Sequence, residues 1–349
     1  NIQEEPHKRR VRYKGKYPKN YKEKYKELNP EKYQDTIEKV IRKGSTPAGM
    51  HISIMVKEII DFLQIKPGQT GFDATLGYGG HTRAMLECLK GQGHMYATDV
   101  DPIESAKTKK RLAEAGFGED ILTIKLQNFC TIDEIAKEAG GFDFVLADLG
   151  VSSMQIDNPD RGFSFKVDGP LDLRLNPEKG ISAAERLAGI GEEELAGMLW
   201  ENSDEPYAEE LAHAIVTEIK HGKPIETTTR LREVIEETLS FLPEKERKDT
   251  VKKTCQRTFQ ALRIDVNNEF EVLYEFMEKL PGALKPGGRA AILTFHSGED
   301  KLVKKALKQG YKEGIYSEIA NDVVRPSAEE CAQNGRARST KMRWAVRAE

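Results

Sequence analysis

Two segments of the sequence bring together residue types that could do chemistry. DATLGYGGHT (residues 73–82) and DLGVSSMQIDNPDRGFSF (residues 148–165) both stand where predicted strands end. In the first, Gly77, Gly79 and Gly80 let the backbone approach a ligand closely, since side chains there would block it. The second offers an acid, a carbonyl-rich turn and a Ser-Ser pair. Together they predict a site where a transferred group meets its acceptor.

Asp99 complements the glycine turn. It ends a predicted strand 22 residues after Gly77, the distance at which a carboxylate commonly accepts hydrogen bonds from ribose hydroxyls. The turn departs from G-x-G-x-x-G, because Thr82 stands at the third glycine's position. The pattern predicts an adenosine-bearing cofactor and suits NAD and S-adenosylmethionine alike. A structural turn with a surface acid is the alternative.

Two further residues follow predicted strands. Phe129 is placed to face an adenine ring, and plain core packing is the alternative. Asp148 follows the fourth strand, at the sheet edge where ligands bind in open α/β folds. A helix cap is the other role open to Asp148.

The elements that must position these residues alternate between strand and helix. Helical patterns cover residues 51–63, begin again at Gly80, and run from Pro102 to about Ala115. Strands are predicted over residues 71–76, 94–99, 121–126 and 142–147. This alternation predicts an α/β fold with a parallel, doubly wound sheet.

The alternation stops after the fourth strand and resumes near the C-terminus. Residues 259–280 predict a helix, residues 289–295 a buried strand, and KMRWAVR (341–347) an antiparallel edge strand. The patterns between are helical only. We therefore expect four parts: a basic arm (1–45), a first sheet segment (46–156), a helical insertion (157–255) and a second sheet segment (256–349).

The charge of the chain is unevenly distributed. The net charge is −3, yet residues 1–45 hold 14 Lys/Arg against 7 Asp/Glu, with tyrosines interleaved. Cations that neutralise phosphates and rings that stack on bases suit a nucleic acid. A solvated tail is the alternative. The C-terminal basic residues are expected to extend a phosphate-binding surface: Arg336, Arg338, Lys341, Arg343 and Arg347.

Several classes of protein are disfavoured. The four cysteines never form a C-x-x-C pair, so neither a zinc site nor a disulfide framework is predicted, and no metal is expected. The sequence has no run of about 18 apolar residues, which argues against a membrane span. A polar, basic N-terminus without an apolar stretch argues against secretion and favours the cytoplasm.

Six blocks resemble the ribosomal RNA small subunit methyltransferase H family, also called MraW. The resemblance extends over residues 51 to 347, and the blocks stand in the family's order. They are DATLGYGGHT, DLGVSSMQIDNPDRGFSF, DGPLDLR (168–174), RTFQALRIDVNNE (257–269), TFHSGED (294–300) and ARSTKMRW (337–344). Ser203-Asp204-Glu205-Pro206 replaces the family's Gly-Glu-Glu-Arg, a departure typical of a divergent branch or paralogue.

The resemblance implies a class I S-adenosylmethionine-dependent methyltransferase, a Rossmann-like doubly wound sheet with an inserted helical domain. It implies methylation of N4 of a cytidine in 16S rRNA, in the decoding region, with the rRNA or the small ribosomal subunit as partner. The helical insertion would face the RNA, and a monomer and a homodimer both remain open. Cofactor contacts are implied at Gly79, Gly80, His81, Asp99, Phe129, Asp148 and Gln155.

Asp148 is the candidate catalytic residue. An exocyclic cytosine amine is a poor nucleophile, because its lone pair is delocalised into the ring. We expect Asp148 and the carbonyls of the turn at 148–150 to accept the amino hydrogens of a flipped cytidine and so to aim its lone pair. The alternatives are a methyltransferase for another RNA, DNA or a small-molecule amine, an NAD-dependent dehydrogenase, and a non-catalytic RNA-binding assembly factor.

Overall fold

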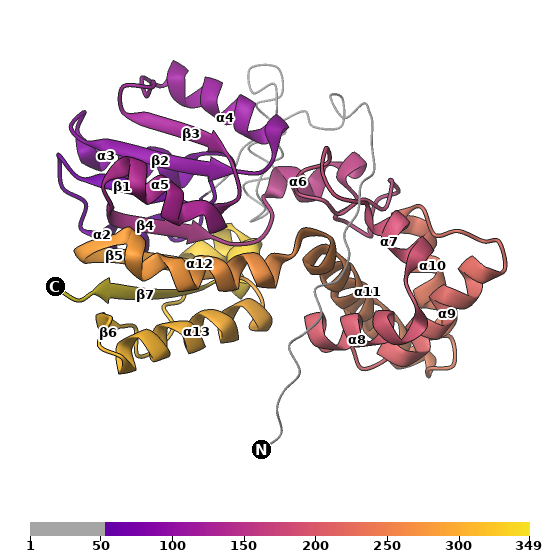
Figure 1. Ribbon diagram of the computed structural model, residues 1–349. Helices are drawn as coiled ribbons and strands as arrows, with labels where there is room; N and C mark the ends of the chain where they lie inside the picture. The colour runs from indigo at the N-terminus through magenta and orange to yellow at the C-terminus, as the bar shows by residue number, and fades with distance from the viewer. Residues whose placement is uncertain (1–52) are drawn as a thin grey trace. The chain divides into compact units, whose positions relative to one another are not determined.

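The computed structural model describes residues 53–349, which form two compact units (Figure 1). The sheet unit comprises residues 53–154 and Phe270–Glu349, and the helical unit comprises Gln155–Glu269. The predicted basic arm, residues 1–45, lies outside the described residues, as do the first two residues of the helix expected over 51–63.

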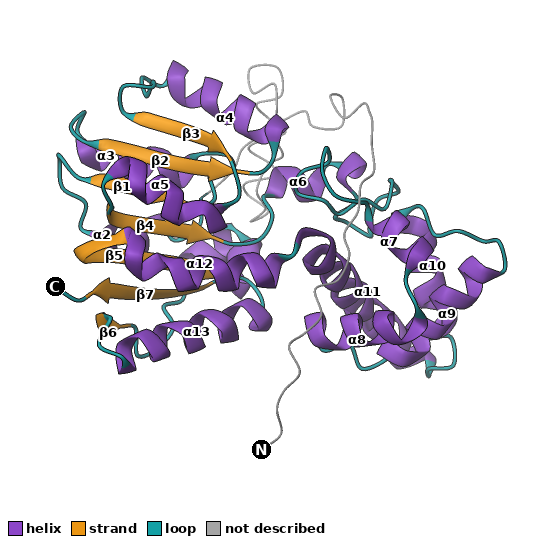
Figure 2. Cartoon of the chain, viewed as in Figure 1, coloured by secondary structure: helices purple, strands orange, loops and turns teal. Residues whose placement is uncertain are grey.

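A seven-stranded sheet with the order β3-β2-β1-β4-β5-β7-β6 forms the centre of the sheet unit (Figure 2). Its first five strands are parallel, and β7 runs antiparallel to both β5 and β6. This arrangement confirms the predicted α/β, doubly wound sheet. The strands are β1 (Thr70–Asp73), β2 (His94–Asp99), β3 (Leu122–Leu126), β4 (Phe142–Asp148), β5 (Leu284–Thr294), β6 (Tyr316–Ile319) and β7 (Lys341–Arg347).

Helices cover both faces of this sheet. Along β4, Val145 and Ala147 point into one apolar cluster, and Phe144 and Leu146 into the other, as the alternation of side chains along a strand requires. The first cluster packs against α5 (Ile132–Ala139), α12 (Glu269–Ala283) and α13 (Ser297–Lys312). The second packs against α2 (Val56–Leu63), α3 (Gly80–Leu89) and α4 (Pro102–Glu114).

Three details differ from the sequence-based expectation. KMRWAVR is not the edge strand, because β6, which was not predicted, pairs with its outer side. The single helix expected over 259–280 is two helices, α11 (Glu244–Asn267) and α12, since Asn268 takes a left-handed φ of 52° and ends the first. The strand β1 ends at Asp73, and the residues after it turn into the glycine loop.

The helical unit has its own apolar core. Amphipathic helices contribute buried residues such as Leu195, Leu211, Leu231 and Leu262 to one cluster. The helices are α7 (Ala183–Gly189), α8 (Glu192–Ser203), α9 (Ala208–Lys220), α10 (Thr228–Thr238) and α11. None of the helices in residues 53–349 combines the length and hydropathy that a membrane crossing needs.

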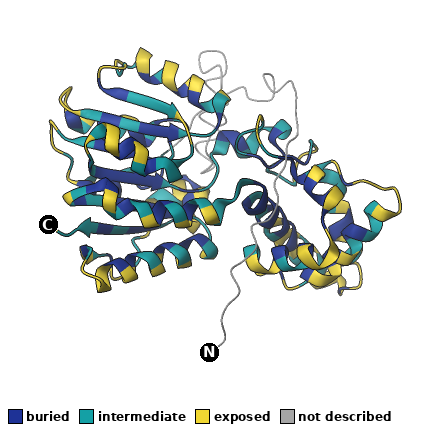
Figure 3. Ribbon diagram, viewed as in Figure 1, coloured by how far each residue is buried: buried dark blue, intermediate teal, exposed yellow. Residues whose placement is uncertain are grey.

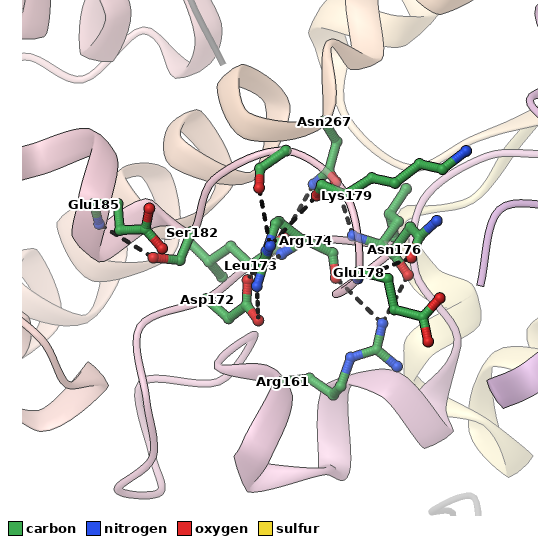
Figure 4. A network of polar contacts seen from close by, with 12 residues as sticks. Arg161, Asp172, Leu173, Arg174, Asn176, Glu178, Lys179, Ser182, Glu185 and Asn267 are labelled. Carbon is green, nitrogen blue, oxygen red and sulfur yellow. Dashed lines mark hydrogen bonds and ion pairs between the residues drawn. The ribbon is translucent and has the colours of Figure 1, made fainter. Parts of the chain in front are cut away.

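A buried ion pair ties down the loop that precedes α7 (Figure 4). Arg174 donates through Nε to Asp172 Oδ1 at 2.5 Å and through Nη2 to Oδ2 at 3.1 Å, and both side chains are almost fully buried. Between them Leu173 has a φ of 67°, a conformation that a branched side chain rarely adopts. Asn267 donates to the Leu173 carbonyl at 2.7 Å. These contacts hold a strained segment of the DGPLDLR block in place.

Candidate functional site

The candidate site lies where the sheet changes winding direction. The strands β1 and β4 are neighbours, and the chain leaves them toward opposite edges of the sheet, so their carboxyl ends frame a switch point at which open α/β folds bind ligands. The Asp148 amide donates to the Thr75 hydroxyl at 2.7 Å. This bond joins the loop after β1 to the end of β4, and so connects the two segments singled out in the sequence.

The three glycines of the loop differ in what surrounds the place where a Cβ atom would stand. A Cβ on Gly79 would lie 2.7 Å from the Thr108 methyl group, and one on Gly80 would lie 1.8 Å from the Ser53 hydroxyl. Packing within the protein therefore excludes side chains at these two positions. Gly77, with a φ of 51°, has no atom nearer than 3.9 Å to its notional Cβ. Of the three, Gly77 is the one that faces free space.

Helix α4 holds this loop from outside. The Thr108 hydroxyl donates to the Gly77 carbonyl, and Arg111 Nη1 donates to the Tyr78 carbonyl at 2.7 Å. The Arg111 guanidinium also lies 3.7 Å from the centre of the Tyr78 ring, a cation–π contact. The loop conformation is thus set by side chains about 30 residues away, which the sequence analysis did not identify.

Asp99 is bonded to the loop it was expected to complement. Its Oδ2 accepts from the Gly77 amide at 3.1 Å, and its Oδ1 accepts from the Asp101 amide at 2.9 Å. Burial raises the pKa of Asp99 to about 7, against the effect of these two amides. A carboxylate offers about four acceptor positions, so two of them remain for further donors. This donor set fits the two hydroxyls of a ribose.

The buried His81 forms a pair with the partly exposed Asp148. His81 Nδ1 lies 3.4 Å from Asp148 Oδ2, and its Nε2 lies 2.7 Å from the Ile54 carbonyl oxygen. Burial disfavours a charged imidazole, but the hydrogen bond and charge of Asp148, with the Ile54 carbonyl, outweigh it and raise the pKa of His81 to about 9. His81 is therefore protonated at neutral pH. Its ring is only 7% exposed and orients the carboxylate.

A second acid, Asp73, supports this pair and was missed as a site residue. It is fully buried, and it accepts from the Thr82 hydroxyl at 2.6 Å and the Thr75 amide at 3.0 Å. Burial raises the pKa of Asp73 in spite of these bonds and of the nearby His81. The signal was present in the sequence, since Asp73 ends β1 just as Asp99 ends β2 and Asp148 ends β4.

Phe129 and Gln155, the remaining expected site residues, and His296 lie in three different settings. Phe129 packs against Phe276 in a T-shaped arrangement, with ring centres 5.2 Å apart, and lies partly buried against the core. Gln155 is buried on α6 (Ser153–Asp157), at the start of the helical unit. His296, in the TFHSGED block, caps α13 by accepting from the Glu299 amide.

The expectation for the C-terminal basic residues is wrong for Arg343. Arg343 is buried and donates through Nε and Nη2 to the two carboxylate oxygens of Asp300, at 2.8 and 3.0 Å. Arg347 donates to the carbonyls of Pro281 and Ile315. The buried Arg343 guanidinium joins strand β7 to α13 and does not form part of a phosphate-binding surface, and for the partly exposed Arg347 the expectation stays a prediction.

Comparison with known proteins relates the chain to one family. Residues 48–348 match the model of the MraW methylase family. Ribosomal RNA small subunit methyltransferase H 1 of Agathobacter rectalis is 84% identical over 347 residues, covering 99% of both chains. Ribosomal RNA small subunit methyltransferase H 2 of Alkaliphilus metalliredigens is 63% identical and again covers 99% of both. Ribosomal RNA small subunit methyltransferase H of Thioalkalivibrio sulfidiphilus is 38% identical, covering 86% of this chain and 98% of its own.

Proposed function

The chain belongs to the MraW methylase family, and from this premise we propose that it methylates N4 of a cytidine in the decoding region of 16S rRNA, using S-adenosylmethionine. The sheet unit has the Rossmann-like class I methyltransferase fold. The names of the relatives favour small-subunit ribosomal RNA as substrate. The cytoplasm is the proposed location. The observation that carries the proposal is the position of the Gly77–Asp99 pair and the His81–Asp148 pair around one switch point.

The residues present fit the cofactor. Gly77 leaves free space where a Cβ would stand, and Asp99 keeps acceptor positions for the ribose hydroxyls. Gly79, Gly80 and Phe129 shape the surroundings, and Gln155 is proposed as a further contact. When bound, S-adenosylmethionine supplies an electrophilic methyl group on a sulfonium centre.

Asp148 acts on the acceptor. Its carboxylate accepts hydrogen bonds from the amino hydrogens of a flipped cytosine and thereby directs the nitrogen lone pair toward the methyl group. The protonated His81, anchored on the Ile54 carbonyl, keeps this carboxylate in one orientation. The nitrogen becomes strongly acidic once the N–C bond has formed, so water can take its proton. Asp148 is a positioning acceptor and need not be a strong base.

The alternative functions differ in how well they account for these observations. Membership of a methylase family argues against hydride transfer with NAD. A non-catalytic assembly factor would have no need for the Asp99–Gly77 bond and the His81–Asp148 pair. Methylation of another RNA, of DNA or of a small-molecule amine would use the same site, so it is the alternative that experiment must separate.

The test of the proposal is mass spectrometry of 16S rRNA from a strain that lacks the gene, with and without this chain supplied in trans. We expect N4-methylcytidine at one position to disappear on deletion and to return on complementation. A matched strain supplied with the Asp148→Asn variant should stay unmodified. Full modification without the gene would overturn the proposal.

The raised pKa of Asp99 predicts how cofactor affinity depends on pH. The ionised Asp99 carboxylate accepts hydrogen bonds from both ribose hydroxyls. The protonated form, which prevails at a pH below its pKa of about 7, donates one hydrogen bond and so loses one of these two acceptor positions. Binding is therefore coupled to loss of a proton, and affinity falls up to about tenfold per pH unit below 7 and is level above it.

Calorimetry with methylthioadenosine checks this prediction, because the ligand has no group that titrates between about pH 6 and 8. Asp99→Asn should weaken binding roughly tenfold to a hundredfold at pH 8 and abolish the pH dependence. An unaltered pH profile in Asp99→Asn would assign the titration to another group.

A further inference from the structure

The exposed face of α13 carries five lysines and no acid. They recur at helical spacing, so they line one side of the helix over three turns: Lys301, Lys304, Lys305, Lys308 and Lys312. With Gln309 they surround one open hollow on the surface, and Figure 3 shows this side of α13 as largely exposed. The helix packs its other side, with Val303 and Leu307, on the sheet.

None of these ammonium groups has a hydrogen-bond or ion-pair partner within residues 53–349. The acids of the first turn are used elsewhere: Glu299 accepts from the Phe295 amide, and Asp300 is bound by Arg343. Other surface lysines of the sheet unit do have partners, as Lys109 has Glu119 and Lys110 has Glu114. Like charges three and four residues apart destabilise a helix, so a bound polyanion would relieve a repulsion that the fold leaves uncompensated.

The position of this lysine face relates it to the candidate site. Leu293 of β5 pairs with Asp148 of β4, and α13 begins three residues after β5 ends, at the same edge of the sheet. The lysines then run away from that edge for about 16 Å, at 1.5 Å per residue. Tyr311, 54% exposed on the rim of the face, offers a ring for stacking.

We infer that the lysine face of α13 binds the phosphate backbone of the substrate RNA and leads the strand to the methylation site. The inference rests on the proposed function, since it takes RNA as the substrate. A phosphate chain matches this row of cations with an aromatic beside it better than a protein partner does, because the residues that line the hollow are five lysines and a glutamine, whereas protein interfaces are depleted in lysine. The family resemblance had pointed to the helical insertion instead.

The test is a full-length variant in which Lys304, Lys305 and Lys308 are all replaced by Gln. Glutamine keeps the helix propensity and removes three charges. We expect RNA affinity to fall roughly tenfold to a hundredfold and the slope of log affinity against log salt to become shallower by about 2, at about 0.7 per phosphate contact of a single strand. KM for RNA should rise, whereas kcat at saturating RNA and cofactor affinity should stay unchanged.

A matched control replaces Lys107, Lys109 and Lys110 of α4 by Gln, which removes the same charge from another exposed helix of the sheet unit. An equal loss in the control, or an unchanged salt slope in the α13 variant, would overturn the inference while the wild type still methylates RNA. A wild type that neither binds nor methylates small-subunit rRNA would overturn the proposed function, and this inference with it.

Discussion

Replacement of Asp148 by Asn is expected to slow methyl transfer to RNA by about 10²–10³-fold, the range seen when one preorganised polar group is removed from an active site. The amide offers one acceptor oxygen and presents two hydrogens of its own. It therefore repels one of the amino hydrogens that the carboxylate accepts, and the cytosine nitrogen is no longer aimed. The substitution also removes the charge that His81 faces across 3.4 Å.

Two measurements separate chemistry from folding in this variant. Single-turnover methylation with saturating RNA and S-adenosylmethionine measures the rate of the chemical step. Titration of the His81 ring by NMR measures its pKa, which depends on the pairing with Asp148. With its anionic partner gone, the pKa of His81 should fall well below about 9, because burial then acts with little opposition.

Asp143→Asn provides the matched control. Asp143 lies on the same strand, β4, at the end away from the site, where it accepts from the Thr70 amide and contacts Lys285. Its replacement should leave the single-turnover rate and the titration of His81 unchanged. A wild-type rate in Asp148→Asn with intact cofactor binding would exclude Asp148 from the chemistry.

Asp172→Ala is expected to lower the free energy of unfolding by about 3–5 kcal/mol, the usual cost of leaving one member of a buried ion pair alone. The Arg174 guanidinium cannot give up its proton, and it would keep only the carbonyls of Gly180 and Lys179 as partners. Loss of the carboxylate also frees the strained Leu173 between the two. Urea unfolding followed by fluorescence of Trp200, on α8 of the same unit, measures the change.

The double variant Asp172→Leu with Arg174→Met tests the physical reason. Apolar replacement of both partners of a buried pair is often close to neutral, so this variant should recover most of the lost stability. An exposed pair of the same unit, Asp249 with Lys253, provides the control, and Asp249→Ala should leave the unfolding midpoint unchanged. A single variant as stable as the wild type would contradict the role given to the pair.

The predicted secondary structure agrees with the observed one where the local sequence patterns are strong. The strands β2, β3 and β4 lie within a residue of their predicted bounds, because each is a short run rich in apolar residues between turn signals. The strand β6 escaped notice, since YSEI is four residues long with two exposed side chains. The break at Asn268 was also missed, because an asparagine in the left-handed conformation resembles any other helix residue in sequence.

The sequence by itself determined the α/β class, the family resemblance and the spacing that brings Asp99 to Gly77, because each depends on residues close together or on contiguous blocks. The tertiary structure alone decided which groups act on one another. It paired His81 with Asp148 and Arg111 with the glycine loop, it removed Arg343 from the surface by joining it to Asp300, and it left the α13 lysines without partners among residues 53–349. The physical reason is common to all four: burial and charge pairing depend on neighbours distant in sequence. The glycine loop and its contact with Asp99 could thus be predicted from spacing, whereas the arrangement around Asp148 could be known only from the fold.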